Sequence, residues 1–251
     1  MLLRNQMEVH GNLLFKYRGE LPVLLIPPGL YLLYAQITST PQHNWEGFLA
    51  WYNLVCLGVV VLGQLIRAYT LAHVAANTSG RNVHGQIADV VNNTGLYSMV
   101  RHPLYVGNFF MALGVAMLSC NAWFVLVYIL AFWIYYERII YAEEHFISQK
   151  FDERLKEWAM KTSTFIPMLS AFKKPATPFN WKKVIRQEKN GILATFCIFF
   201  IYHVVQNLAL GKTLDTADAW TGGWSIAFAA SILYYLVVRT LSKRTNLLES
   251  L

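Results

Sequence analysis

Charged residues are scarce in this sequence. Only 14% of its 251 residues are Asp, Glu, Lys or Arg, and 55% are hydrophobic, whereas a soluble domain carries about 25% charged residues. The mean hydropathy of +0.35 points in the same direction. A chain of this composition has too little polar material to cover its surface in water, so we predict a membrane protein.

Cysteine is also rare. The three cysteines, Cys56, Cys120 and Cys197, lie in or beside apolar runs and form no Cys-x-x-Cys pair. This spacing argues against a disulfide framework and against a zinc or other metal site. No apolar run precedes Leu21, so the sequence does not predict a cleavable signal peptide.

Six apolar segments approach the length needed to cross a bilayer, which is about twenty residues for a helix. They are residues 21–39, 48–71, 104–119, 123–141, 192–210 and 224–238. The first contains Pro27-Pro28-Gly29, so we expect it to be kinked or broken near its middle. The predicted fold class is therefore all-α, a polytopic transmembrane helix bundle of about six spans.

The basic residues predict how this bundle is oriented. They flank the apolar segments, as topogenic charges and contacts with anionic lipids do, and this argues against a nucleic-acid partner despite the net charge of +7. With the N-terminus in the cytoplasm, every one of the 21 Lys and Arg residues except Lys212 falls on the cytoplasmic side. Two long cytoplasmic segments, 72–102 and 143–190, follow from this topology.

The expected division of the chain follows from these spans. It comprises a cytoplasmic segment (1–20), two spans (21–76), a core of loop, helical hairpin and amphipathic helix (77–170), a basic linker (171–190) and a two-span extension (191–251). Within the core, residues 143–160 carry apolar side chains at helical spacing. They are predicted to continue the fourth span out of the membrane as an amphipathic helix.

Polar residues gather where the third span begins. Pro103 suits the first turn of a helix, where free N–H groups attract anions. Arg101 and His102 add side-chain donors at the same place, so the segment is suited to bind a carboxylate or a phosphate. Arg-His before a span is also an ordinary interfacial anchor, and Tyr105 also suits the aromatic belt of a membrane protein.

Two adjacent carboxylates, Glu143 and Glu144, end the fourth span. Acidic residues at a helix C-terminus oppose the helix dipole, so they call for a cationic partner. The candidates are a sulfonium cofactor, Arg101 and Arg138. Alternatively, the pair only begins a solvated face of the helix.

Taken together, the two constellations resemble a known family. Gly-x-Tyr (95–97), Arg-His-Pro-x-Tyr-x-Gly (101–107), a hairpin of spans, Glu-Glu (143–144) and Phe151 are similar to the signature of the isoprenylcysteine carboxyl methyltransferase and phospholipid methyltransferase superfamily. The resemblance covers about residues 63–167. It implies S-adenosylmethionine as the cofactor, bound in a cytoplasmic cofactor pocket of the helix bundle. It also implies a lipid or lipidated substrate, such as a prenylcysteine carboxylate, a phospholipid amine or a lipid phosphate.

The resemblance also implies which residues bind the cofactor. They are Tyr97, His102, Pro103, Leu104, Tyr105 and Glu143, with Val91 and Asn92 from the run before Gly-x-Tyr. Two positions depart from the family pattern. The family often has an Arg four residues before the first Glu, where this chain has Ile139; Arg138 is one residue earlier and so rotated by about 100° on a helix. The family's Phe-Gly after the Glu pair is Phe151-Asp152 here.

We predict in-line transfer of the sulfonium methyl group to an oxygen of an anionic lipid head group. A carboxylate or phosphate is already ionised and needs no base, so orientation and exclusion of water provide the catalysis. The catalytic candidates are Arg101 and Arg138 as cationic clamps for the head group. Glu144 is the candidate base if the acceptor is an amine.

Two other function classes stay open at this point. Membrane NADPH-dependent reductases of sterols or polyprenoids share a similar C-terminal architecture, although the Glu-Glu pair favours the methyltransferase. A non-catalytic lipid-binding protein of the same fold is the other class. The expected location is a membrane with the site facing the cytoplasm, and a bacterial inner membrane is preferred. No oligomeric state follows from the sequence.

Overall fold

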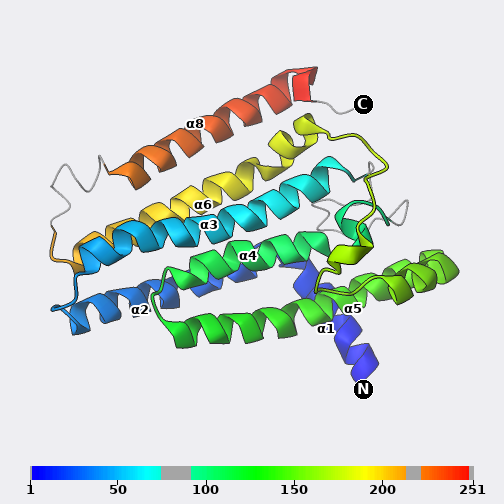
Figure 1. Ribbon diagram of the computed structural model, residues 1–251, viewed down its shortest axis with the longest axis horizontal. Coiled ribbons are helices and arrows are strands. Elements are labelled where there is room, and N and C mark those ends of the chain that lie inside the picture. The colour runs from blue at the N-terminus through cyan, green and yellow to red at the C-terminus, as the bar shows by residue number, and fades with distance from the viewer. Residues whose placement is uncertain (1, 75–91, 213–221, 249–251) are drawn as a thin grey trace.

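The computed structural model describes residues 2–74, 92–212 and 222–248. Within these ranges the chain is helical and forms no β-strand, only two isolated backbone bridges. Six of the helices lie side by side along one axis (Figure 1). They are α2 (Ile26–Ser39), α3 (Trp45–Ala72), α4 (Pro103–Met117), α5 (Ala122–Lys161), α6 (Trp181–Ala209) and α8 (Gly223–Arg244).

The predicted membrane bundle is confirmed. Among the described residues, four helical segments are long and apolar enough to cross a membrane: α3, Ala122–Gln149 of α5, α6 and α8. The apolar helix α4 has 15 residues and α2 has 14, both shorter than a full span. The chain is therefore a multi-pass membrane protein, and a total of six spans stays a prediction.

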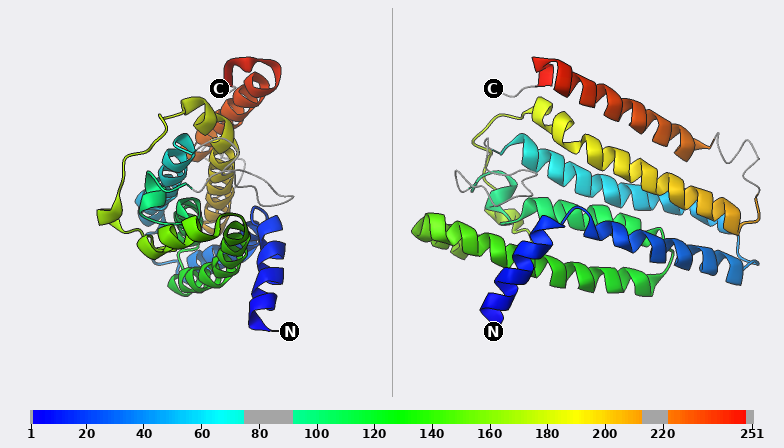
Figure 2. Two further views of the ribbon diagram at one scale, coloured as in Figure 1. Left: turned by 90° about the vertical axis from the view of Figure 1, so that its right-hand side faces the viewer. Right: turned by 180° about the vertical axis from the view of Figure 1, so that it is seen from behind.

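The remaining helices are short or lie outside the bundle. Helix α1 (Leu3–Lys16) packs across α5 at one end of the bundle (Figures 1 and 2). Single turns of 3-10 helix are η1 (Leu21–Leu25), η2 (Leu96–Ser98), η3 (Leu169–Ala171) and η4 (Asn246–Leu248). The segment 1–20, expected only to be cytoplasmic, is thus largely helical.

Asparagine side chains cap three of the long helices. Asn44, Asn121 and Asn180 accept hydrogen bonds from backbone N–H groups three residues later, at 3.0, 2.9 and 2.9 Å. Helix α6 begins at Trp181, directly after the Asn180 cap. The second half of the linker predicted at 171–190 is therefore the first ten residues of α6. Helix α5 runs unbroken to Lys161, so residues 143–160 are helical as predicted, and their exit from the membrane stays a prediction.

The first apolar segment is broken at its proline pair, as expected, because η1 ends at Leu25 and α2 begins at Ile26. Pro27 and Pro28 occupy the first turn of α2, and η1 precedes them. Proline is tolerated there because the first N–H groups of a helix have no partner within the helix. The expected break near the middle of residues 21–39 is therefore a helix start.

Glycines bring α3 and α4 close together. A Cβ on Gly107 would lie 2.5 Å from Cγ of Arg67, and one on Gly114 would lie 2.6 Å from the carbonyl oxygen of Cys56. A Cβ on Gly63 would collide with the backbone of Gly107. Small residues permit this approach of two backbones, which is a common way for helices to pack in membranes.

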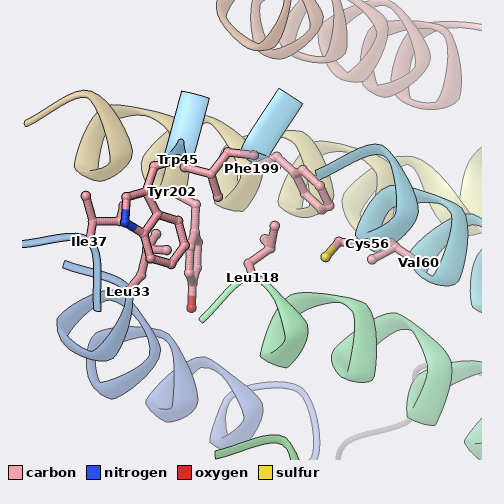
Figure 3. Packing of buried hydrophobic residues seen from close by; sticks show 9 residues of the cluster. Leu33, Ile37, Trp45, Cys56, Val60, Leu118, Phe199 and Tyr202 are labelled. Atoms are coloured by element: carbon pink, nitrogen blue, oxygen red, sulfur yellow. The ribbon is translucent and has the colours of Figure 1, made fainter. Parts of the chain in front are cut away.

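A buried apolar cluster packs the end of the bundle where α2 ends and α3 begins (Figure 3). Figure 3 shows Leu33 of α2, Cys56 of α3 and Tyr202 of α6 converging with Leu118, the residue after α4. Helix α8, in contrast, packs mainly on α6 and exposes apolar side chains such as Leu233. An outward apolar face of this kind suits contact with lipid.

The opposite end of the bundle carries the polar connections. The end of α3, the starts of α4 and α6, and the end of α8 all lie there (Figures 1 and 2). Both termini lie at this end as well. The Arg-His-Pro motif at the start of α4 therefore lies at the end of the bundle where α1 crosses α5.

Candidate active site

His102 occupies the centre of the candidate site. It is the residue before α4, and Pro103 starts the helix as predicted. Nε2 of His102 is 3.1 Å from Oε1 of Glu144, and Nδ1 is 3.5 Å from Oε2 of Glu143. The two predicted motifs therefore meet, although His102 and Glu144 are 42 positions apart in the chain.

Arg101 also contacts Glu144. Its Nε forms an ion pair with Oε1 of this residue at 3.0 Å. Its Nη1 donates to the backbone oxygen of Ala159 over 3.3 Å, and its Nη2 donates to the hydroxyl of Thr164. Each Nη carries two N–H groups. Within the described ranges, each Nη makes one of these two hydrogen bonds. A second N–H on each Nη is thus left for a ligand.

The charges of this cluster balance when His102 is protonated. Burial by itself would lower the pKa of His102, but hydrogen bonds and charge from Glu143 and Glu144 outweigh it and raise the pKa above its ordinary value of 6.5. Protonated His102 and Arg101 then offset the two carboxylates. His102 and Arg101 are thus cationic partners of the Glu-Glu pair, and the side chains of Glu143 and Glu144 stay partly exposed.

An aromatic wall continues from His102 into the bundle. The ring of Tyr105 stacks on that of His102, with centroids 5.5 Å apart and an angle of 8° between the planes. The ring of Tyr136 follows, 4.6 Å from that of Tyr105. Both tyrosines are buried. The carboxylates therefore border an aromatic surface, and such surfaces attract cations.

Backbone pairing holds the segment before α4 in place. Gly95 donates from its N–H to the carbonyl oxygen of Lys173 over 3.0 Å, and Arg101 donates to that of Ser163 over 2.9 Å. Gly95 has a φ of +61°, which side chains with a Cβ rarely adopt. This pairing fixes Arg101 and His102 relative to the segment that follows α5.

Tyr97 lies in η2, within the same segment. Its carbonyl oxygen accepts a hydrogen bond of 3.1 Å from Nε1 of Trp158, near the end of α5. The last turns of the long helix α5 therefore contact the Gly-x-Tyr motif, while its middle carries Glu143 and Glu144. One helix thus contacts both halves of the predicted site.

The other predicted cofactor residues take different positions. Pro103 is fully buried, and Leu104 beside it is half-buried. Asn92 is half-buried in the segment before η2. Val91 lies outside the described residues, and so do the side chains at 151–152, which carry the departure from the family's Phe-Gly.

Arg138 points elsewhere. Its Nη1 donates to the carbonyl oxygen of Ile134, one turn earlier on α5, over 2.9 Å at the protein surface. Within the part of the chain that the structure describes, its guanidinium contacts neither Glu143 nor Glu144 nor His102. The rotation expected from its shifted position in the sequence agrees with this placement.

Sequence reasoning missed a buried polar network beside the aromatic wall. Arg67 of α3 forms an ion pair with Glu188 of α6 at 2.7 Å and donates to Oδ1 of Asn108 over 2.5 Å. Nδ2 of Asn108 donates to the hydroxyl of Tyr136 over 3.0 Å, and Gln64 donates to Glu188 over 2.7 Å. The available signal was an ionisable residue, Arg67, inside a predicted span, a position that often marks function.

Comparison with protein families finds a match in the middle of the chain. Residues 55–149 match the model of the isoprenylcysteine carboxyl methyltransferase (ICMT) family. This match covers less than half of the chain, so it shows that this segment is similar to the ICMT family. The ICMT region contains Arg101, His102, Glu143 and Glu144, so the charged cluster lies within it. Helices α1, α6 and α8 lie outside it.

Two relatives carry the name of this enzyme family. The chain is 28% identical over 127 residues to the protein-S-isoprenylcysteine O-methyltransferase of Xenopus laevis, covering 50% of this chain and 44% of that protein. The enzyme of the same name from Schizosaccharomyces pombe is 30% identical over 125 residues, covering 47% and 50%.

A relative with a different name also matches. The nickel-cobalt-cadmium resistance protein NccN of Alcaligenes xylosoxydans xylosoxydans is 32% identical over 146 residues, covering 58% of this chain and 64% of that protein. The chain thus spans less than two thirds of the length of each of these three relatives. No solved structure matches the chain significantly.

Proposed function

We propose that this protein transfers the methyl group of S-adenosylmethionine to an anionic oxygen on a lipid-borne head group. The observation that carries the proposal is the contact of His102 with both Glu143 and Glu144. It joins the two halves of the family signature in one charged site beside an aromatic wall. The names of the isoprenylcysteine O-methyltransferase relatives support an oxygen acceptor.

The donor set fits a cationic cofactor that also carries a carboxylate. Glu143 and Glu144 offer negative charge, with side chains 20% and 29% exposed, and the face of Tyr105 favours a cation. The remaining N–H groups of Arg101 suit a carboxylate. Bound S-adenosylmethionine would supply an electrophilic methyl group.

The protein's own residues then have three tasks. Glu143 and Tyr105 orient the cofactor, and His102 holds Glu143 and Glu144 in position. Arg101 ties Glu144 to the segment after α5 and offers donors to an anion. An ionised acceptor oxygen needs no general base, so orientation and exclusion of water are the main catalytic contributions.

We also propose that this site faces the cytoplasm, in a bacterial inner membrane. Support comes from the charge distribution, since basic residues such as Arg101, Lys173 and Arg244 lie at the site's end of the bundle. Lys212, the exception in the sequence count, pairs with Glu46 at the other end, at 3.0 Å. The basic end suits contact with anionic lipids.

Two measurements test the proposal on the full chain in detergent or lipid nanodiscs. A ligand of the native state raises the unfolding temperature, by an equivalent of about 2.7 kcal/mol at a hundred times its Kd. We expect S-adenosylhomocysteine to raise it and NADPH to leave it unchanged. Labelled methyl groups from S-adenosylmethionine should appear in lipids extracted from the source membrane. Stabilisation by NADPH alone would overturn the proposal in favour of a reductase.

A further inference from the structure

The buried network beside the site links α6 to α5 through α3 and α4. Glu188 of α6 is 3% exposed and binds Arg67 through both carboxylate oxygens, at 2.7 and 3.3 Å. Arg67 donates in turn to Oδ1 of Asn108, and Nδ2 of Asn108 donates to the Tyr136 hydroxyl. A series of hydrogen bonds therefore runs from α6 to the aromatic wall.

The direction of each hydrogen bond from Glu188 to Tyr136 follows from the chemistry of the groups. A guanidinium can only donate, so the amide atom of Asn108 that faces Arg67 must be its oxygen. The amide nitrogen must then face Tyr136, whatever orientation is drawn for the amide group. The oxygen of Tyr136 therefore accepts, and its own proton must point elsewhere. Among the described residues, no atom accepts that proton.

Tyr136 stands at the inner edge of the candidate site. Its ring contacts that of Tyr105, which stacks on His102. Tyr136 also precedes Glu143 by seven residues on α5, or about two helical turns, so both lie on the same face of the helix. A ligand bound against Tyr105 and Glu143 would therefore lie beside the Tyr136 hydroxyl.

We propose that Tyr136 donates a hydrogen bond to the acceptor oxygen of the substrate, and that Glu188, Arg67 and Asn108 are positioning residues that impose this direction. The inference rests on the proposed methyl transfer and adds a basis for its specificity. An ionised carboxylate or phosphate accepts hydrogen bonds, whereas a protonated amine can only donate them. A tyrosine held as a donor therefore selects an anionic oxygen over an amine.

The first test reverses the hydrogen bond without removing a side chain. Asn108→Asp keeps an oxygen towards Arg67 and presents a second oxygen to Tyr136, whose proton must then turn towards the aspartate. Tyr136→Phe removes the hydroxyl. For methylation of N-acetyl-S-farnesylcysteine, a prenylcysteine carboxylate, we expect both variants to lower kcat/KM by about 10- to 100-fold, the range for a hydrogen bond to a charged group.

The accompanying readouts separate positioning from simple damage. The KM for S-adenosylmethionine should stay within about twofold in both variants, and the double variant should be no worse than either single one, because coupled residues are non-additive. Asn53→Asp is the matched control. Asn53 forms a buried amide pair with Gln206, also between α3 and α6, so its variant can lower stability without lowering kcat/KM.

A spectroscopic test needs no catalysis. The infrared difference spectrum of the wild type minus Tyr136→Phe isolates the C–O stretch of this phenol, whose frequency distinguishes an accepting from a donating hydroxyl. We expect an accepting phenol in the wild type and a donating one in Asn108→Asp. A donating phenol in the wild type without ligand would overturn the inference. An accepting phenol without any methyl transfer would contradict the proposed function instead.

Discussion

Nε2 of His102 lies 3.1 Å from Oε1 of Glu144, the same oxygen that Nε of Arg101 approaches to 3.0 Å. One carboxylate oxygen therefore receives two cationic groups from the segment before α4. This arrangement makes the Arg-His-Pro and Glu-Glu motifs one charged unit. Each motif alone had an ordinary structural explanation, as an interfacial anchor or as the start of a solvated helix face.

Replacing His102 should disable the site without unfolding the protein. His102→Asn removes the cation between two carboxylates, and we expect a loss of methyl transfer of at least about tenfold and of stability of about 1–3 kcal/mol. Methyl transfer and thermal unfolding measure the two effects. His145→Gln is the control, since His145 lies on the same helix as Glu143 and contacts Gln149 and Glu8 near the surface. Equal activity in the two variants would contradict the role of His102.

The raised pKa of His102 predicts how stability depends on pH. A group whose pKa is higher in the folded state stabilises the fold fully below its unfolded pKa, here 6.5. This contribution is lost as the pH rises through the folded pKa. The difference in unfolding temperature between wild type and His102→Asn should therefore be largest near about pH 6 and shrink towards about pH 9. A difference that grows with pH would show that the pKa is lowered instead.

Arg101 and Arg138 should behave differently. Arg101→Ala removes the contacts with Glu144, Ala159 and Thr164, so we expect methyl transfer to fall by at least about tenfold, and Arg101→Lys should not restore it, because lysine lacks the planar fork. Arg138→Ala should retain activity within about twofold, as most surface substitutions do. Loss of activity in Arg138→Ala alone would reverse this assignment.

The glycine contact between α3 and α4 should be intolerant of a methyl group. Gly107→Ala places a Cβ 2.5 Å from Cγ of Arg67 and 2.8 Å from the backbone oxygen of Gly63. We expect destabilisation by about 1–3 kcal/mol, the usual range for overpacking. Gly58→Ala on α3 is the control, because nothing lies within 4 Å of its added Cβ; it should be neutral or stabilising. Thermal unfolding in detergent measures both.

Several elements could be predicted from local pattern alone. The start of α4 at Pro103 and the extension of α5 to Lys161 follow from rules that involve only nearby residues. Other elements could not. The start of α6 was missed because a basic, proline-containing stretch resembles a linker, and the Asn180 cap was not recognised. The proline pair predicted a kink or a break, and only the structure showed that it is a break at the start of α2.

The candidate site was also predictable only in part from the sequence. Membership of Arg101, His102, Tyr105 and Glu143 was predicted from the motifs, and the structure brings these residues together. The guanidinium of Arg138 lies at the surface, since one residue of shift on a helix turns a side chain by about 100°. The roles of all these residues in binding and catalysis stay predictions.

The sequence by itself determined that this is an all-α membrane protein, and it predicted chemistry near residues 101–105 and 143–144. Apolar run length and motif spacing are local properties, and a bilayer leaves a helical chain few alternatives. Only the tertiary structure decided which charges meet. Arg67 and Glu188 are 121 positions apart, and their pairing depends on how α3 and α6 pack. A buried charge is stabilised by whichever partner the packing brings within reach, and no local pattern encodes that partner.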